Sequence, residues 1–128
     1  MSVLAKKVLD IGCGYGLISS ILKNNGNFVI ALDISRKMVL EARRRGVKAY
    51  QCDIENEDIP IRYKFNVILM TEVLEHFLDP IPILRKIKRN LKKEGLLYIS
   101  TPNCAYWYNR FQLLMGRVPN FGEKNKTI

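Results

Sequence analysis

Short apolar runs of strand length alternate with amphipathic stretches along most of the chain. The apolar runs occupy residues 7–11, 28–33, 48–52, 65–71 and 96–101. Parallel strands are buried on both faces, so they read as nearly continuous apolar runs, and the stretches between them supply crossover helices. The pattern therefore predicts an α/β fold with a doubly wound, mostly parallel sheet of about five strands and helices on both faces.

Helix start and stop residues place the connections between the strands. The first helix is expected at residues 17–23, and the second at 36–45 with Ser35 as its N-cap. The third is expected to begin after Pro80 and to end before Gly95, with an apolar face of Ile83, Leu84, Ile87 and Leu91. Residues 53–64 predict a connection with at most one helical turn. The whole chain, 1–128, is expected to form a single domain, in which the polar, irregular residues 117–128 form a loose tail.

Composition and length narrow the class of protein. A chain of 128 residues, 48% of them hydrophobic, is sufficient for one core. Its apolar runs are much shorter than the roughly 20 residues of a membrane-spanning helix. The N-terminal residues lack the apolar stretch of a secretory signal, so a cytoplasmic location is expected. Cys13, Cys52 and Cys104 show no C-x-x-C spacing, which indicates reduced, structural cysteines rather than a disulfide framework or a zinc site.

A glycine-rich loop lies between the first strand and the first helix, in the run V-L-D-I-G-C-G-Y-G from Val8 to Gly16. Glycines let a ligand approach the backbone closely, and the helix that follows offers unpaired N–H groups, although ordinary turns also use glycine. The dinucleotide fingerprint G-x-G-x-x-G requires glycine where Leu17 stands, which argues against a nicotinamide cofactor. Asp10 would repel a pyrophosphate, but it suits a cationic ligand such as S-adenosylmethionine, which carries an ammonium and a sulfonium.

The run from Val8 to Gly16 resembles the first motif of class I S-adenosylmethionine-dependent methyltransferases, and later motifs follow in that family's order. Asp33 ends the second strand about 20 residues after Gly12, the spacing of a carboxylate that binds ribose hydroxyls. The resemblance implies adenine contacts from Asp53, Ile54 and Met38. For Met38, an ordinary place in the core is an alternative nearly as good. The cofactor-binding residues that it implies are Asp10, Gly12, Cys13, Gly14, Tyr15, Gly16, Asp33, Ile34, Met38, Asp53, Ile54, Thr71 and Leu74.

A polar cluster follows the fourth strand directly, in the run T-E-V-L-E-H from Thr71 to His76. Ligands of open α/β sheets bind beyond the carboxyl ends of the strands, so Glu72, Glu75 and His76 are the candidate catalytic residues. The E-x-x-E-H pattern resembles one in small-molecule methyltransferases, including ubiquinone-pathway O-methyltransferases, where it has been linked to a divalent cation. Three roles stay open for the cluster: ligands of a metal, a base that takes a proton from an acceptor hydroxyl, or caps of the next segment. No metal is assigned.

The chain is basic, with a formal net charge of +9. Basic residues cluster in the expected third helix and its end, at Arg85, Lys86, Lys88, Arg89, Lys92 and Lys93, and another group, Arg43, Arg44 and Arg45, closes the second helix. A nucleic-acid contact is one interpretation of this charge. We favour solvated helix faces, because the apolar stripe of the third helix directs its charges toward water.

The resemblance covers about Val8 to Phe111, and the family's sheet normally continues with a sixth and a seventh strand. Their absence predicts a truncated form whose fourth strand exposes an edge that a second copy or a partner chain would cover. After Thr101-Pro102-Asn103, the aromatic stretch resembles a region that often covers the acceptor site, and a helix packed on the sheet is the alternative. The predicted function is methyl transfer from S-adenosylmethionine to a small-molecule acceptor. The alternatives are a non-catalytic cofactor-binding or interaction module and an RNA methyltransferase.

Overall fold

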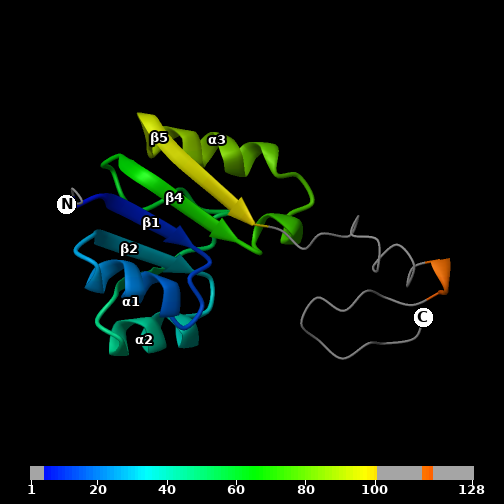
Figure 1. Ribbon diagram of the computed structural model, residues 1–128. Coiled ribbons are helices and arrows are strands. Elements are labelled where there is room, and N and C mark those ends of the chain that lie inside the picture. The colour runs from blue at the N-terminus through cyan, green and yellow to red at the C-terminus, as the bar shows by residue number, and fades with distance from the viewer. Residues whose placement is uncertain (1–4, 101–113, 117–128) are drawn as a thin grey trace.

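The computed structural model describes residues 5–100 and 114–116, and its strands form one parallel sheet with helices on both faces (Figure 1). In chain order the elements are β1 (Lys7–Ile11), α1 (Leu17–Asn24), β2 (Phe28–Asp33), α2 (Arg36–Arg44), β3 (Lys48–Gln51), β4 (Phe65–Thr71), the short 3₁₀ helix η1 (Leu74–His76), α3 (Ile81–Arg89) and β5 (Leu91–Ser100). The strand order is β3-β2-β1-β4-β5, and every neighbouring pair is parallel. The predicted doubly wound α/β sheet is confirmed.

Two packed layers cover the two faces of the sheet. On one face Leu9 and Ile68 belong to the same buried cluster as Ile83 of α3. On the other face Ala31 packs with Ala42 of α2, and α1 contacts β2. Successive residues of a strand point to opposite faces, so each continuous apolar run of the sequence supplies both layers.

The strand order reverses beside β1, and this reversal positions the ligand site. From β1 the chain proceeds through β2 to β3, and it then returns to the other side of β1 to form β4. The connections after β1 and β4 consequently leave the carboxyl edge toward opposite faces. Such a switch point opens a crevice at the carboxyl ends of the two strands.

Most predicted element boundaries agree with the structure to within one residue. β1, β2 and β4 begin and end as predicted, whereas β3 ends one residue early at Gln51. The predicted N-cap of α2 is confirmed, because the Ser35 Oγ accepts a hydrogen bond from the Met38 N–H at 3.4 Å. In the connection 53–64 the chain makes a turn at 54–56 without forming a helix.

The third helix is shorter than predicted, and this is a correction. It ends at Arg89, and Leu91 already pairs with Phe65 of β4. The next paired residue of β5 is Leu96, opposite Val67, so residues 92–95 bulge out of the ladder. Asn90 ends the helix because its side-chain amide is buried and donates to the carbonyls of residues 61 and 63, at 2.6 and 3.3 Å. Lys92 and Lys93 therefore lie on the bulge of β5, outside the helix.

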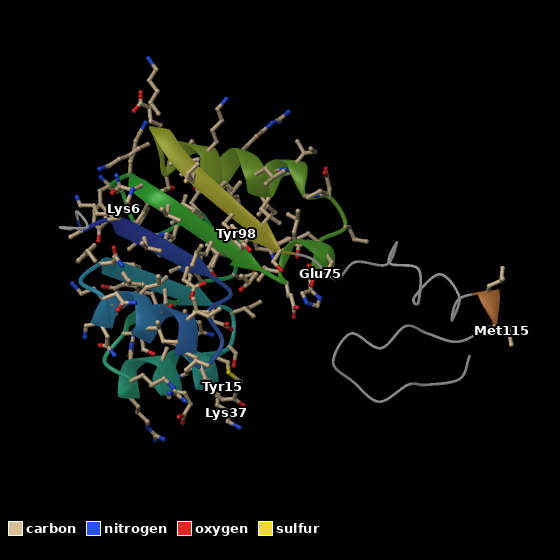
Figure 2. All side chains as sticks on the ribbon, in the orientation of Figure 1. Lys6, Tyr15, Lys37, Glu75, Tyr98 and Met115 are labelled. Atoms are coloured by element: carbon tan, nitrogen blue, oxygen red, sulfur yellow. The ribbon has the colours of Figure 1, made fainter. Side chains whose placement is uncertain are left out.

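The prediction of an exposed edge at the fourth strand is wrong, because β4 lies between β1 and β5. Of the strands in the described residues, β3 and β5 are the outer ones. On β5, Leu96 and Tyr98 are 68% and 60% exposed; Tyr98 is labelled in Figure 2. Beside α1, a cavity of about 490 Å³ lies against Val67, Leu69 and Tyr98. The fourth strand is covered because β5 pairs with it along most of its length.

Some predictions fall outside the described residues. These are the last residue of the predicted fifth strand, Thr101, the aromatic stretch after it, Cys104, and the tail 117–128. Within residues 5–100 and 114–116, no helix combines the length and apolar character needed to cross a membrane.

Candidate functional site

A cavity of about 480 Å³ opens at the carboxyl ends of β1, β2 and β4. Its acidic lining residues come from different connections: Asp33 ends β2, Asp53 and Glu55 follow β3, and Glu72 follows β4. The remaining lining residues are Ile11, Gly12, Leu32, Ile34, Cys52, Ile54, Thr71, Val73, His76 and Phe77. The cavity therefore combines an apolar wall with carboxylates contributed by separate loops.

The glycine loop is bonded to the end of β2. The N–H groups of Gly12 and Cys13 both donate to the Leu32 carbonyl, at 2.8 and 3.0 Å. Gly12 has a φ of 75°, and a Cβ at this position would lie 2.2 Å from the Val73 Cγ2. Only glycine fits here without displacement, because the loop after β4 crosses directly against the loop after β1.

Gly16 has a different role, which is to bring α1 and α2 together. Its φ is 80°, and a Cβ would lie 2.8 Å from the Cβ of Ala42 and 3.0 Å from its Cα. A Cβ on Gly14, by contrast, would meet no atom within 4 Å. Gly12 thus serves the cavity wall, Gly16 allows the helices to pack, and Gly14 lies in an open turn.

Asp33 links β2, the glycine loop and α2. One carboxylate oxygen, Oδ2, accepts the Gly14 N–H at 2.9 Å, and Oδ1 accepts the Ser35 N–H at 2.8 Å. A carboxylate oxygen can accept two hydrogen bonds, and each oxygen of Asp33 accepts one from the backbone, so both retain acceptor capacity. The predicted ribose ligand is therefore held in position by two backbone donors and lines the cavity.

Asp10 lies behind the cavity and does not line it. Its side chain is 2% exposed, and Oδ2 accepts a hydrogen bond from the fully buried Ser19 hydroxyl at 2.6 Å. Burial raises the pKa of Asp10, the Ser19 hydrogen bond opposes this shift, and the nearby Asp33 carboxylate adds to it. The structure thus places this carboxylate as a link between β1 and α1.

Cys13 belongs to the packing of the α2 face. It packs against the cluster that contains Ala42 and Val47. Burial raises the pKa of its thiol to about 12, and the charges of Asp10 and Asp33 act in the same direction. Both described cysteines, Cys13 and Cys52, are free. The prediction of reduced, structural cysteines stays a prediction.

The turn after β3 is organised around Asp53. Its Oδ1 accepts the Glu55 N–H at 3.2 Å, and its Oδ2 accepts the Asn56 side-chain amide at 2.8 Å. The hydrogen bond from Asn56 is the main cause that lowers the pKa of Asp53. The carboxylate therefore stays ionised while Asp53, Ile54 and Glu55 face the cavity.

The candidate catalytic residues are divided by the loop after β4. Glu72 and His76 line the cavity, whereas Glu75 does not, although it lies at the same edge of the sheet (Figure 2). Glu72 has a φ of 56°, and its N–H donates to the Ser100 carbonyl at 2.6 Å. A non-glycine residue in this region is strained, and such residues concentrate at functional sites. Here the strain turns the chain out of β4 so that the Glu72 side chain enters the cavity wall.

The spacing of the side chains in this cluster tests whether they could hold a metal ion together. The His76 Nε2 lies 4.0 Å from the Glu75 Oε1. In the part of the chain that the structure describes, no group of three or more His, Cys, Asp or Glu side chains is arranged to hold a metal ion.

Several predicted cofactor residues lie outside the cavity lining. They are Asp10, Cys13, Gly14, Tyr15, Gly16, Met38 and Leu74. Leu74 packs against the core on the α3 face, and Tyr15 is exposed. The lining residues that the sequence analysis missed are Ile11, Leu32, Cys52, Glu55, Val73 and Phe77. Most of these directly precede or follow a predicted site residue at a strand end, and that adjacency is the signal that could have found them.

Comparison with known proteins agrees with this geometry. The sequence profile of a methyltransferase domain matches residues 3–125. The chain is 38% identical over 112 residues to the ubiquinone biosynthesis O-methyltransferase of Glaesserella parasuis, and the match covers 79% of this chain and 47% of that protein. A possible histamine N-methyltransferase from Thermotoga maritima superimposes with a TM-score of 0.72 at 26% identity, over 89% of this chain and 53% of that one. Coclaurine N-methyltransferase bound to N-methylheliamine and S-adenosylhomocysteine gives a TM-score of 0.67 at 28% identity, over 77% of this chain and 31% of that one.

The fold and the cavity define a Rossmann-like nucleotide-binding domain of the methyltransferase type. The chain belongs to the class I S-adenosylmethionine-dependent methyltransferase family, as its motifs predicted. S-adenosylmethionine is the cofactor of this family. The chain spans about half the length of the curated relatives it matches.

Proposed function

We propose that this chain binds S-adenosylmethionine in the cavity at the carboxyl ends of β1, β2 and β4, and that it forms the cofactor-binding part of an enzyme that methylates a small molecule. The observation that carries the proposal is the shared cavity: a glycine loop, an apolar wall and carboxylates from separate strand ends meet at the switch point of the sheet. Nucleotide-like ligands bind at such points in open α/β sheets.

The lining residues fit each part of this cofactor. Gly12 lets the loop after β1 pack directly against Val73, which lines the same cavity, because a Cβ on Gly12 would collide with the Val73 side chain. The free acceptor positions of Asp33 suit ribose hydroxyls, and Ile54 with the Asp53 carboxylate suits an adenine ring and its amine. The remaining carboxylates suit a ligand with an ammonium and a sulfonium, since charges of opposite sign attract. The bound cofactor supplies a methyl group that its sulfonium has already activated.

The protein's part in the reaction is to position the acceptor and to accept a proton. His76 lines the cavity, and its imidazole suits the removal of a proton from an acceptor hydroxyl near neutral pH. Glu72 lines the same wall and suits a hydrogen bond to the acceptor. The ubiquinone biosynthesis O-methyltransferases among the relatives support an oxygen atom as the acceptor.

A methyl-transfer assay tests this proposal. The full chain is incubated with S-adenosylmethionine that carries a tritiated methyl group and with a panel of small phenols and catechols. Transfer of label to an acceptor is expected, and a chain with Glu72 and His76 both replaced by alanine is the matched control. A chain that binds the cofactor and transfers no label would favour the second candidate function, a non-catalytic cofactor-binding or interaction module that a partner chain completes.

The structure gives less support to the RNA methyltransferase alternative. Lys92 and Lys93 lie on the β5 bulge rather than on α3, and the Lys86 ammonium donates to backbone carbonyls. The six basic residues that the sequence predicted in one helix are therefore divided between α3 and the bulge of β5. Three other expectations stay predictions: a cytoplasmic location, a partner chain or second copy, and a single domain with a loose tail.

A further inference from the structure

Lys86 is the most extensively hydrogen-bonded side chain of α3. Its Nζ donates to three backbone carbonyls across the α3 face of the sheet: Ile54 at 2.7 Å, Glu57 at 2.9 Å and Glu55 at 3.2 Å. An ammonium has three N–H donors, so all of them are used. Hydrogen bonds from a charged donor are shorter and stronger than those between neutral groups.

The carbonyls that Lys86 binds belong to the turn that forms one wall of the cavity. Asp53, Ile54 and Glu55 all line the cavity, and the turn lies in a connection without a helix or strand. The local hydrogen bonds of the turn are centred on Asp53, and Lys86 ties the other end of the turn to the body of the domain. Ile54 also packs in the main core cluster, and the Arg89 guanidinium lies 3.4 Å from the Asp58 carboxylate just beyond the turn. Lys86 supplies the hydrogen bonds from α3 to the carbonyls of the turn itself.

The base of the Lys86 side chain is rigidly placed. Ile83 and Ile87, on either side of it along α3, are 2% and 0% exposed and belong to the main core cluster. The core therefore fixes where the Lys86 stem begins, and the three carbonyls fix where its ammonium lies.

We propose that Lys86 is a positioning residue for the cofactor cavity: its ammonium binds the carbonyls of residues 54, 55 and 57 and holds the turn with Asp53 and Ile54 facing the cavity before the ligand binds. This inference rests on the proposed function. If a site is in its binding-competent conformation for only a fraction of the time, its apparent Kd equals the intrinsic Kd divided by that fraction. If loss of the tie leaves the turn correctly placed for about a tenth of the time, the apparent Kd rises about tenfold.

The test compares Lys86→Met with Lys86→Arg and Lys88→Met in the full chain. Methionine retains an apolar stem and removes every donor, arginine retains charge and donors, and Lys88→Met makes the same change of charge at an exposed position of the same helix. Calorimetric titrations use S-adenosylhomocysteine and its inosine analogue, which differs only in the base. Lys86→Met is expected to weaken S-adenosylhomocysteine binding about tenfold and to reduce discrimination between the two bases, while Lys86→Arg and Lys88→Met stay near the wild type.

A second measurement does not depend on the ligand. The N–H groups of Asn56 and Glu57 both donate to the Asp53 carbonyl, at 3.1 and 2.7 Å. Their hydrogen exchange is expected to become faster in Lys86→Met while exchange in β1 and β4 is unchanged. If Lys86→Met does not fold, Lys86→Gln, which retains donors without charge, carries both measurements.

The outcomes separate the inference from the proposed function. A wild-type chain that does not bind S-adenosylhomocysteine refutes the proposed function and, with it, the cofactor role of Lys86. A wild-type chain that binds, together with a folded Lys86→Met of equal affinity and equal base discrimination, overturns the inference and leaves the proposed function standing. Unchanged exchange at Asn56 and Glu57 also overturns it, because the turn would then not depend on Lys86.

Discussion

Replacement of Gly12 by alanine tests the contact between the glycine loop and the loop after β4. The added Cβ would lie 2.2 Å from the Val73 Cγ2, and Gly12 has a φ of 75°. Left-handed backbone costs a residue with a Cβ about 1–2 kcal/mol. Overpacking costs about 1–3 kcal/mol more, since the β-branched Val73 has little freedom to turn away. Gly12→Ala is therefore expected to lower the free energy of unfolding by about 2–5 kcal/mol.

A double-mutant cycle separates the two causes. Val73→Ala removes both Cγ atoms and, at a half-buried position, is expected to cost about 1 kcal/mol by itself. In the double variant the collision is gone and the backbone cost remains, so a favourable coupling of about 1–3 kcal/mol is expected. Gly14→Ala is the control: its φ is 56° and a Cβ would meet nothing within 4 Å, so it carries the backbone cost alone.

Urea denaturation followed by circular dichroism measures each free energy of unfolding. A coupling within experimental error of zero would refute the reasoning, because it would mean that Gly12 and Val73 do not compete for the same space. Equal losses from Gly12→Ala and Gly14→Ala would refute it as well.

Three further changes test other parts of the site. Asp10→Asn keeps an acceptor for Ser19 and removes a buried charge. Burial raises the Asp10 pKa above its ordinary value of 3.8, so between pH 3.8 and the folded pKa the folded state holds a proton that the unfolded state has lost. The stability that this group contributes is therefore lost as pH rises from 3.8 through the folded pKa. The variant should show a flatter dependence of stability on acidic pH and no loss of stability at pH 7. Asp33→Ala should weaken S-adenosylhomocysteine binding about 10–100-fold through the loss of hydrogen bonds to a charged acceptor, with the exposed Asp79→Ala as control; calorimetry that finds equal affinity for Asp33→Ala would exclude the ribose role. His76→Ala should lower turnover of a hydroxyl acceptor about a hundredfold with little effect on cofactor affinity, and unchanged turnover in the label-transfer assay would remove His76 from the reaction.

The sequence predicted the fold well where local patterns decide it. β1, β2 and β4 are continuous apolar runs bounded by turn residues, and the Ser35 cap marks the start of α2. The end of α3 was mispredicted because it depends on Asn90, whose amide binds carbonyls of a segment nearly thirty residues earlier in the chain. Hydrophobic periodicity continues through this point to Leu91, and it carries no information about such a distant contact.

The candidate site likewise contains residues that the sequence predicts and contacts that arise only when separate elements pack together. Asp33, predicted from its spacing after Gly12, and Asp53, implied by the family resemblance, both line the cavity, because the carboxyl ends of parallel strands meet at one edge of the sheet. Asp10 was predicted to face the ligand, whereas its carboxylate accepts a hydrogen bond from Ser19, since the direction of a side chain near a strand end depends on which face of the sheet that residue occupies. The closeness of Gly12 to Val73 and the tie from Lys86 to the turn after β3 arise only when separate elements pack together.

The cavity at the ends of β1, β2 and β4 is expected to bind the methyl donor, and a single calorimetric titration measures this binding. The wild-type chain is titrated with S-adenosylmethionine, with S-adenosylhomocysteine, and with a nicotinamide dinucleotide as the competing class of ligand. Saturable binding of one equivalent of each sulfur-containing ligand, weakened by Asp33→Ala, is expected, with no binding of the dinucleotide. Binding of the dinucleotide without binding of either sulfur-containing ligand would contradict the account.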